Sequence, residues 1–355
     1  MPSPEGISTY RDGIRLALED SMSADSSVVC IGLGVTDPGA VFGTTSGLLE
    51  RFGPERVFDG PTSENAMTGV GVGAAIAGLR PVMSHQRLDF FLLAMDQLVN
   101  SAAKWHYMFG GHVNVPLTIR LVIGRGWGQG PTHSQNYQAW FAHVPGLRVV
   151  APTFPRDAYG LLRASIEDPN PVVFLEHRWL HNVSGGLNRD DLSTRLDRAR
   201  LCREGTDVTV CASGLNTLEA IKAVDWMSSQ GVSCDLIDLR TLNPIDWPTI
   251  SRSVAKTGRL VAVDSGAITG SVSGEIVARM TEQHFAELKC APVRVAQPDV
   301  PEPTSVGLTA NFHVTSRVIA KAISCQLEGE SSMANFPEAD TAIHDVPGSW
   351  FKGPF

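Results

Sequence analysis

The chain has 355 residues, of which 43% are hydrophobic and 19% are charged, and its formal net charge is −8. This length is sufficient for two domains with large cores. The negative charge argues against nucleic acid or an anionic membrane surface as the main partner. The sequence contains no run of 18 apolar residues, and residues 1–20 lack the apolar core of a signal peptide, so we expect neither a membrane span nor export.

In the first half of the chain, short apolar runs alternate with helical patterns, as is typical of a parallel sheet covered on both faces. The expected strands are residues 28–35, 81–86, 116–124, 147–152 and 171–177. The expected helices are residues 10–22, 64–79, 90–105 and 156–167. We therefore predict a first α/β domain over residues 1–187.

A polar, charged stretch over residues 188–205 is predicted to be an interdomain linker. A second α/β domain is expected over residues 206–326. Its expected strands are residues 207–214, 234–242, 259–265 and 292–298, and its expected helices are residues 217–230, 246–256, 273–286 and 313–326. The tail, residues 327–355, is rich in Ser, Pro, Gly and acidic residues, and we expect it to wrap over a neighbouring surface or to be disordered.

The six cysteines have no CxxC spacing, which argues against a metal or redox motif. Cys30, Cys211 and Cys234 lie in or beside apolar runs, as buried thiols do. We therefore expect a reduced protein of the cytoplasm.

A single carboxylate, Glu64, stands at the beginning of a Gly/Ala-rich helix. Ser63 is a suitable N-cap for this helix, and the small residues that follow, such as Gly71 and Gly73, allow another backbone to approach closely. This position suits a side chain that contacts a ligand at an interface between helices. The alternative is an ordinary first-turn acid stabilised by the helix dipole.

A glycine-rich loop over residues 124–135 leaves a predicted strand and contains His133. In parallel sheets, such loops usually present active-site side chains. Histidine can donate or accept a proton near neutral pH, although a lone loop histidine is often a surface residue. Two other glycine patterns, at residues 69–73 and 32–34, fail the dinucleotide-binding context because one lies within a helix and the other lacks the third glycine.

These features resemble the β subunit of the two-subunit 2-oxo acid dehydrogenase E1 component, the family of pyruvate, branched-chain and acetoin dehydrogenases. The resemblance runs from about residue 6 to residue 322, through residues 47–57, 74–81, 135–143, 145–147, 168–177, 239–242 and 253–258. It implies a transketolase-type pyrimidine-binding domain with a parallel sheet, followed by a transketolase C-terminal α/β domain. It also implies thiamine diphosphate as the cofactor.

The resemblance assigns Glu64 to the carboxyl group that shares a proton with the cofactor's pyrimidine ring and drives its conversion to the imino tautomer. Thr62, Gln86 and Phe90 match further positions at the pyrimidine, where the ring of Phe90 would stack. Without the resemblance, Phe90 would be a core residue. His133 matches a histidine that reaches the substrate and its intermediate.

The Gly-Asp-Gly signature that holds Mg²⁺ and the diphosphate in this superfamily is absent from the sequence. The resemblance therefore implies a partner α subunit that supplies those contacts, in an α2β2 assembly. A lipoyl-bearing acyltransferase, E2, would accept the acyl group. A structural potassium ion is implied at Leu117, Ser165, Ile166, Asp168 and Asn170, although a simple turn explains the last two residues equally well.

Three features depart from the family pattern. Leu33 and Gly34 stand where acids are common, Arg87 replaces an aromatic residue, and residues 264–270 lack a His/Glu pair. An arginine could bind a phosphorylated or carboxylated small-molecule substrate, or it could pair with Asp89.

The leading hypothesis is an E1 β subunit. A split transketolase or acyloin-forming carboligase, and a non-catalytic assembly subunit, remain as alternatives.

Overall fold

The computed structural model describes residues 6–191, 193–327, 336, 345–348 and 350–353. The chain forms two compact units. The first comprises Met1–Gly124, Trp140–Leu196 and Trp350–Phe355, and the second comprises Arg125–Ala139 and Asp197–Ser349. The glycine-rich loop that carries His133 thus belongs to the second unit, although it lies in the N-terminal half of the sequence.

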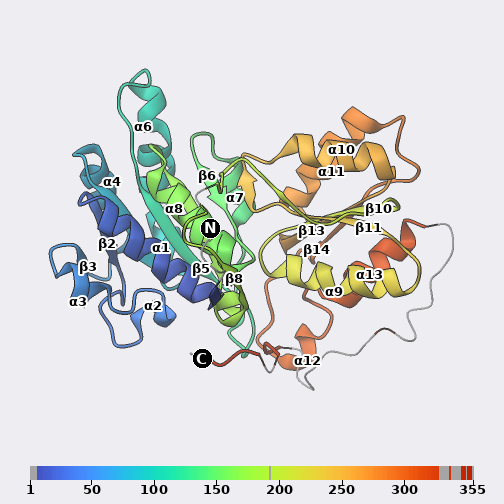
Figure 1. Cartoon of the computed structure of the whole chain (residues 1–355), viewed down its shortest axis with the longest axis horizontal. Helices are drawn as coiled ribbons and strands as arrows, with labels where there is room; N and C mark the ends of the chain where they lie inside the picture. The colour runs from blue at the N-terminus through green and yellow to red at the C-terminus, as the bar shows by residue number, and fades with distance from the viewer. Residues whose placement is uncertain (1–5, 192, 328–335, 337–344, 349, 354–355) are drawn as a thin grey trace. The chain divides into compact units, whose positions relative to one another are not determined.

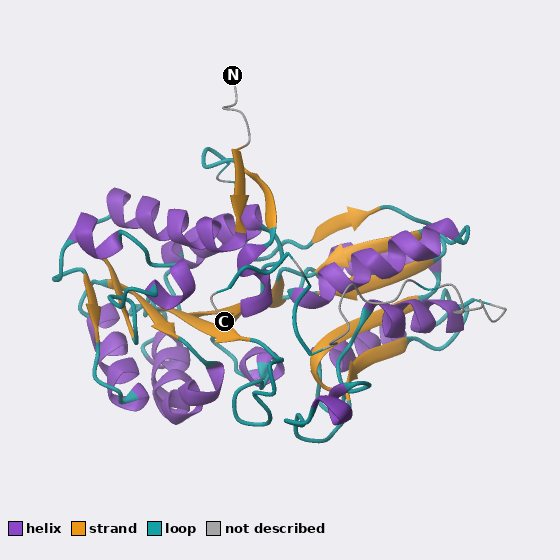
Figure 2. Cartoon of the chain, turned by 90° about the horizontal axis from the view of Figure 1, so that it is seen from below, coloured by secondary structure: helices purple, strands orange, loops and turns teal. Residues whose placement is uncertain are grey.

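The first unit is built on a parallel sheet in which the strands β6-β7-β5-β4-β2-β3 are neighbours in that order. These strands are β2 (Val28–Gly32), β3 (Val57–Asp59), β4 (Arg80–His85), β5 (Thr118–Ile123), β6 (Arg148–Val150) and β7 (Val172–His177). β2, β5 and β7 are buried along their whole length. Burial of both strand faces is expected of a parallel sheet covered on both sides, and helices do lie on both sides of it (Figures 1 and 2).

The helical segments up to residue 182 are α1 (Tyr10–Ala24), α2 (Ala40–Gly43), α3 (Leu48–Phe52), α4 (Glu64–Ile76), α5 (Leu88–Phe91), η1 (Leu92–Ala94), η2 (Gln97–Ala102), α6 (Ala103–Met108), α7 (Gln138–His143), α8 (Pro155–Glu167) and η3 (Arg178–Asn182). The single helix expected over residues 90–105 is therefore wrong. The chain there is divided among an α-turn, a 3₁₀ turn, a π-helix and a second α-helix. The apolar pattern did not reveal these changes of helical geometry.

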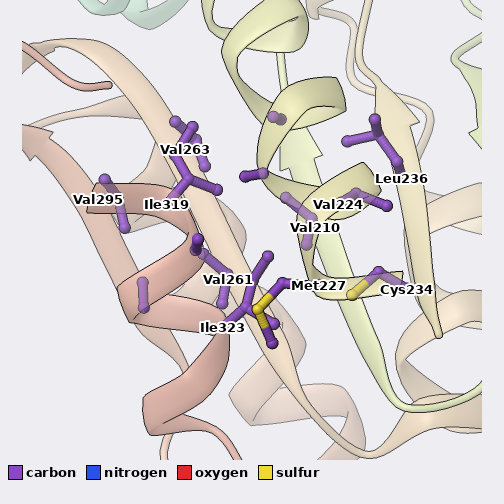
Figure 3. Packing of buried hydrophobic residues seen from close by; sticks show 14 of the residues in the cluster. Val210, Val224, Met227, Cys234, Leu236, Val261, Val263, Val295, Ile319 and Ile323 are labelled. Carbon is purple, nitrogen blue, oxygen red and sulfur yellow. The ribbon is translucent and has the colours of Figure 1, made fainter. Parts of the chain in front are cut away.

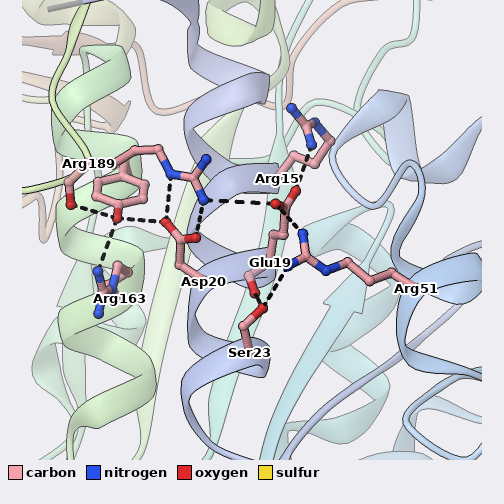
Figure 4. A network of polar contacts seen from close by, with 8 residues as sticks. Arg15, Glu19, Asp20, Ser23, Arg51, Arg163 and Arg189 are labelled. Atoms are coloured by element: carbon pink, nitrogen blue, oxygen red, sulfur yellow. Dashed lines mark hydrogen bonds and ion pairs between the residues drawn. The ribbon is translucent and has the colours of Figure 1, made fainter. Parts of the chain in front are cut away.

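α1 and α8 pack side by side in the first unit (Figure 1). Their close approach requires Gly13, since a Cβ atom there would lie 2.5 Å from the carbonyl oxygen of Pro155. A polar network joins the same helices at the surface, in which the Tyr159 hydroxyl donates to Asp20 at 2.8 Å and Arg189 pairs with Asp20 (Figure 4). Pairs this exposed contribute little individually, about 0–1 kcal/mol.

A small antiparallel pair of strands was not predicted from the sequence. It joins β1 (Gly6–Thr9) to β8 (Ser184–Leu187). Both strands are short, and their Gly and Ser residues are not typical of strands.

The second unit has its own sheet, with strand order β14-β13-β10-β11-β9. Its strands are β9 (Arg200–Arg203), β10 (Val208–Ala212), β11 (Cys234–Asp238), β13 (Leu260–Ala267) and β14 (Val293–Gln297). A short β12 (Thr241–Asn243) follows β11 in the chain but does not belong to this sheet. All neighbouring pairs are parallel except β11 with β9. β9 lies in the stretch expected to be a linker, so the last residues of that stretch are part of the second sheet.

The helices of the second unit are α9 (Leu215–Ser229), α10 (Trp247–Thr257), α11 (Val272–His284), α12 (Val306–Thr309) and α13 (Ser316–Cys325). α9 and α13 lie on one side of the strands, and α10 and α11 lie on the other (Figure 1). Between the sheet and the first pair of helices is a core of fully buried aliphatic side chains, including Val210, Leu236, Val261, Ile319 and Ile323 (Figure 3).

Part of the predicted tail lies within the described residues. Phe336 is buried in the core of the second unit, with its ring 5.1 Å from that of Trp226. In the first unit, the Lys352 backbone N–H donates to Asn182. The expectation of a wrapping or disordered tail otherwise concerns residues 328–335, 337–344, 349 and 354–355, which lie outside the described residues. No helix in the described ranges is long and apolar enough to cross a bilayer.

Candidate active site

Glu64 is the first residue of α4, and its side chain is almost completely removed from solvent, with 6% relative exposure. Its carboxylate makes no hydrogen bond to the part of the chain that the structure describes. Ser63 occupies the expected N-cap position, but its side chain makes no capping hydrogen bond. A carboxylate that is largely enclosed by its own chain, yet has no partner there, is placed to bind a ligand or another chain, so Glu64 is the strongest single indication of a binding site.

α4 packs against β4 and α5, the elements that carry the other candidates of the first unit. Gly71 permits this packing, because a Cβ atom there would lie 2.4 Å from the sulfur of Met83. Gly73 faces open space instead. The two glycines of α4 therefore have different effects. Gly71 allows the helix to pack on the sheet, and Gly73 leaves part of the helix surface uncovered.

The remaining candidates of the first unit lie just before α4, just after β4 and within α5. Thr62 is exposed two residues before Glu64, and Gln86 is exposed immediately after β4. Phe90 is 44% exposed, whereas the adjacent Phe91 is fully buried. The core interpretation of Phe90 is therefore wrong: Phe91 takes that role, and Phe90 lies partly at the surface.

Arg87 is followed by α5 and is half-buried. Burial lowers its pKa, and the charge of Asp89 opposes that shift. Arg178, which our sequence reasoning missed, begins the segment after β7 and is only 3% exposed. Burial, followed by the charge of Arg87, lowers the pKa of Arg178 to about 10. Two guanidinium groups thus influence each other near the carboxyl ends of parallel strands.

The surroundings of Arg178 are tightly built. Its guanidinium lies over the ring of Phe42, 4.5 Å from the centroid. A Cβ atom on Gly124, which follows β5, would be 3.2 Å from Cβ of Arg178. Phe42 itself has a left-handed φ of 61°, as do Ala40 and Val41 at 45° and 42°. Such conformations cost about 1–3 kcal/mol each and persist where the surroundings enforce them, often at functional sites.

The buried charged pair of Arg120 and Glu176 holds Thr44, which lies two residues after this turn. Arg120 Nη2 donates to Thr44 Oγ1 and to Glu176 Oε1, both at 2.8 Å, and Arg120 Nη1 donates to Ser84 Oγ at 3.0 Å. Both Arg120 and Glu176 are fully buried. The burial of Glu176 opposes its ionisation, but Arg120 and His181 hold its pKa below the usual range.

His85, the last residue of β4, is a buried histidine without a hydrogen-bond partner among the described residues. Burial lowers its pKa to about 4, and its ring meets Phe91 edge-on with centroids 4.9 Å apart. It is therefore neutral at pH 7, as a packing residue would be.

His133 lies in the second unit, so the structure does not bring it together with Glu64 inside one compact unit. It is half-buried, and its Nδ1 is 3.1 Å from the hydroxyl of Thr132. The far end of its loop is fixed where the Gln138 amide donates to Asp264 and to Ser265.

The five predicted potassium ligands lie around the loop after α8. Arg80 Nη1 donates to the carbonyls of Ile166 and Asp168 at 2.8 and 3.2 Å, and the Ser165 carbonyl accepts from Thr118 at 3.0 Å. The carbonyl of Leu117 accepts from the Val172 N–H at 2.9 Å. Asn170 Oδ1 is buried without a hydrogen-bond partner in the described ranges, and an orphaned oxygen of this kind fits a hard cation.

Several large apolar side chains of the first unit are exposed on α4, around α5 and at the end of α6. They are Val70, Leu93, Tyr107, Met108 and Phe109, with exposures of 68%, 70%, 88%, 65% and 46%. Large apolar side chains with this much exposure are candidates for contact with another chain.

Two family patterns match the chain. "Transketolase, pyrimidine binding domain" matches residues 8–182, and "Transketolase, C-terminal domain" matches residues 197–319. The chain is 42% identical over 304 residues to the pyruvate dehydrogenase E1 component subunit beta-1, mitochondrial, of Arabidopsis thaliana, with 84% of each chain covered. It is 38% identical over 296 residues to the 2-oxoisovalerate dehydrogenase subunit beta of Bacillus subtilis (strain 168), with 83% of this chain and 90% of the relative covered.

A solved structure described as "Split gene transketolase, inactive beta4 tetramer" superposes with a TM-score of 0.71 at 21% identity, and covers 89% of this chain and 97% of that one. At this identity the likeness concerns the fold alone. Together with the two family patterns, it confirms the predicted pyrimidine-binding and C-terminal domains of transketolase type.

Proposed function

This chain belongs to the family of E1 β subunits of thiamine diphosphate-dependent 2-oxo acid dehydrogenases, and from that premise we propose that it acts with an α subunit to decarboxylate a 2-oxo acid and transfer the acyl group. The observation that carries the proposal is Glu64, a residue only 6% exposed whose carboxylate has no hydrogen-bond partner in the described chain. A silent assembly subunit would have no need of an acid in this setting.

Glu64 would hold a proton at the ring nitrogen of the cofactor's pyrimidine. The residue is only 6% exposed, and a bound pyrimidine would shield the carboxylate further from water, which would strengthen the proton sharing. When bound, thiamine diphosphate supplies a nucleophilic thiazolium carbon and an electron sink for decarboxylation. The exposed ring of Phe90 would stack on the pyrimidine, and Gln86 and Thr62 would offer polar contacts at its rim.

His133 would then move protons on the substrate, a role that suits a half-buried imidazole on a fixed loop. The Mg²⁺ and diphosphate contacts would come from the α subunit, because the sequence lacks the superfamily's Gly-Asp-Gly signature. The exposed apolar side chains on α4 and α6 offer a surface for that subunit. An α2β2 assembly, and an E2 acyltransferase as acceptor, complete the proposal by analogy with the family.

Potassium at residues 117, 165, 166, 168 and 170 is part of the same proposal, supported by the orphaned oxygen of Asn170. The cytoplasmic location is supported by six cysteines that form no disulfide.

One observation keeps the carboligase alternative open. Arg87 and Arg178 create a locally positive region where the sequence has also lost two acids, and such a region suits a substrate with a second anion. Sugar phosphates and dicarboxylic 2-oxo acids both carry such a group. The acceptor of the transferred fragment would distinguish the two reactions.

The cofactor role of Glu64 is tested by Glu64→Gln in the αβ assembly. The amide has nearly the same shape but cannot exchange a proton with the pyrimidine, so turnover should fall by about 10²–10⁴-fold. Glu50→Gln is the matched control, because Glu50 is also a first-turn acid but is exposed. Turnover of Glu64→Gln within about threefold of wild type, far below that range, would contradict the assignment.

The division of the cofactor site between two chains is tested by thermal denaturation with thiamine diphosphate and Mg²⁺. The isolated chain should not be stabilised, whereas the αβ complex should be, because a ligand stabilises only the state that binds it. Strong Mg²⁺-dependent stabilisation of the isolated chain would contradict a site shared with an α subunit.

A further inference from the structure

Asp345, from the C-terminal tail, contacts the beginning of the loop that carries His133, within the second unit. The Trp127 N–H donates to the Asp345 carbonyl oxygen at 2.9 Å, and the Gly128 N–H donates to Asp345 Oδ2, also at 2.9 Å. A single tail residue therefore binds two consecutive backbone donors. Asp345 is 2% exposed, so water competes little for these hydrogen bonds.

The loop that receives these contacts has an unusual backbone. Gly126, Gly128 and Gly130 have φ values of 94°, 66° and 66°, and Trp127 between them has a φ of 55°. A left-handed conformation is unfavourable for a tryptophan, at a cost of order 1–3 kcal/mol, and persists only where the surroundings enforce it. Thr304 confines the loop as well, since a Cβ atom on Gly130 would lie 2.2 Å from its hydroxyl oxygen.

The carboxylate of Asp345 belongs to a buried group of charged and titratable side chains. His313 Nε2 lies 3.7 Å from Asp345 Oδ1 and 3.6 Å from Glu302 Oε1. Burial lowers the pKa of Arg125, while the carboxylates of Glu219, Glu302 and Asp345 oppose that shift. Arg125 is the first residue of the loop segment of this unit, so Asp345 is tied to the loop through charge as well as through hydrogen bonds.

This contact lies beyond the family's C-terminal domain, which matches residues 197–319. It is therefore not accounted for by the matched domain. The opposite end of the loop segment is held by Gln138 and Asp264. His133 lies between the two anchors.

We propose that Asp345 is a positioning residue that fixes residues 126–128 and thereby presents His133 to the substrate. The inference rests on the role proposed above for His133. Asp345 itself takes no part in proton transfer, and its effect is on the geometry of the loop. A small displacement of a catalytic group can reduce turnover by about 10²-fold.

The test compares Asp345→Ala and Asp345→Asn with wild type in the complete αβ assembly. Hydrogen–deuterium exchange at the amides of Trp127 and Gly128 measures the contact directly, and kcat and KM for the 2-oxo acid measure its consequence. Phe336→Ala is the control, because it removes another buried tail contact, with Trp226, that does not involve the loop. His133→Ala, assayed in parallel, tests the proposed function independently.

We expect Asp345→Ala to speed exchange at Gly128, because it removes the carboxylate that accepts from this amide, and to lower kcat by about tenfold or more, with little change in cofactor affinity. Exchange at Trp127 should change less, because its acceptor is the main-chain carbonyl of residue 345, which alanine keeps. Asp345→Asn keeps an oxygen that accepts from Gly128, so it should restore much of kcat. Phe336→Ala should lower stability without changing kcat.

Unchanged exchange at Gly128 in Asp345→Ala would overturn the anchoring. Faster exchange with unchanged kcat, in an assembly where His133→Ala is inactive, would overturn the positioning role alone. If His133→Ala retains full activity, the proposed role of His133 fails and the positioning role fails with it.

Discussion

Gln86 lies directly against Gly34, so closely that a Cβ atom on residue 34 would be 2.1 Å from Gln86 Nε2. Gly34 has a φ of 76°, a conformation that glycine adopts without strain. Because residue 34 has no side chain, the Gln86 amide can occupy the space beside its backbone.

Gly34→Ala should displace the Gln86 amide and weaken the binding of thiamine diphosphate by the αβ assembly. We also expect a loss of stability of about 1–3 kcal/mol, because overpacking adds to the cost of a positive φ. Calorimetric cofactor titration and thermal denaturation measure the two effects. Gly39→Ala is the control, since a Cβ atom there meets nothing within 4 Å and φ is −76°. Equal cofactor affinity in the two variants would contradict the role given to Gln86.

Arg120→Met should destabilise the chain by about 3–5 kcal/mol, because it leaves Glu176 buried without its counter-charge. It should also release Thr44 and the strained turn before it. Combining it with Glu176→Leu should recover much of the loss, since the orphaned charge is then removed. Urea denaturation of the two single variants and the double variant provides the comparison. A double variant as unstable as the sum of the single ones would refute this pairing energy.

Much of the fold could be predicted from the sequence. The strand β2 is a continuous apolar run, β5 and β7 are apolar apart from a few polar residues, and α8 and α10 have clear amphipathic patterns, so local sequence largely defines them. Their observed bounds agree with the expected ones within a few residues.

The missed features depend on contacts between residues far apart in the sequence. No residue type typical of a left-handed turn marks residues 40–42, and that conformation depends on groups such as Arg120 that lie far along the chain. Arg178 follows an expected strand, but its relation to Arg87 depends on strand order. Asp345 likewise reaches Gly128 across 217 residues, in a region with no periodic pattern.

His85→Leu should remove an acid-dependent loss of stability. Burial lowers the pKa of His85 from 6.5 to about 4, so the unfolded chain binds a proton more readily than the folded chain between these pH values. The free energy of unfolding therefore decreases as pH falls from 6.5 towards 4, by about 3 kcal/mol from this residue. Denaturation at pH 7 and pH 4.5 should show a smaller difference in His85→Leu than in wild type. His112→Leu changes an exposed histidine and should keep the wild-type pH dependence. If the unfolding free energy of His85→Leu depended on pH as strongly as that of His112→Leu, His85 would be excluded as the source of the acid-dependent loss of stability.

Arg87→Leu should raise KM selectively for substrates that carry a second anionic group. The reason is electrostatic: Arg178 is almost completely buried, and the charge of Arg87 contributes to the fall of its pKa to about 10. An anion that binds near both guanidinium groups would relieve this repulsion, whereas a plain aliphatic 2-oxo acid would not. Because the lost contact concerns binding rather than chemistry, kcat should change much less than KM.

The measurement is a substrate panel on the αβ assembly: aliphatic, branched and dicarboxylic 2-oxo acids with an artificial electron acceptor, and sugar phosphates with an aldehyde acceptor. Arg15→Leu is the control, because Arg15 lies on α1 and pairs with Glu19 there. The second-anion site would be contradicted if the wild-type assembly turned over aliphatic 2-oxo acids efficiently and showed no activity on the substrates with a second anion, and if Arg87→Leu did not change the aliphatic turnover. The chain would then have an ordinary E1 substrate.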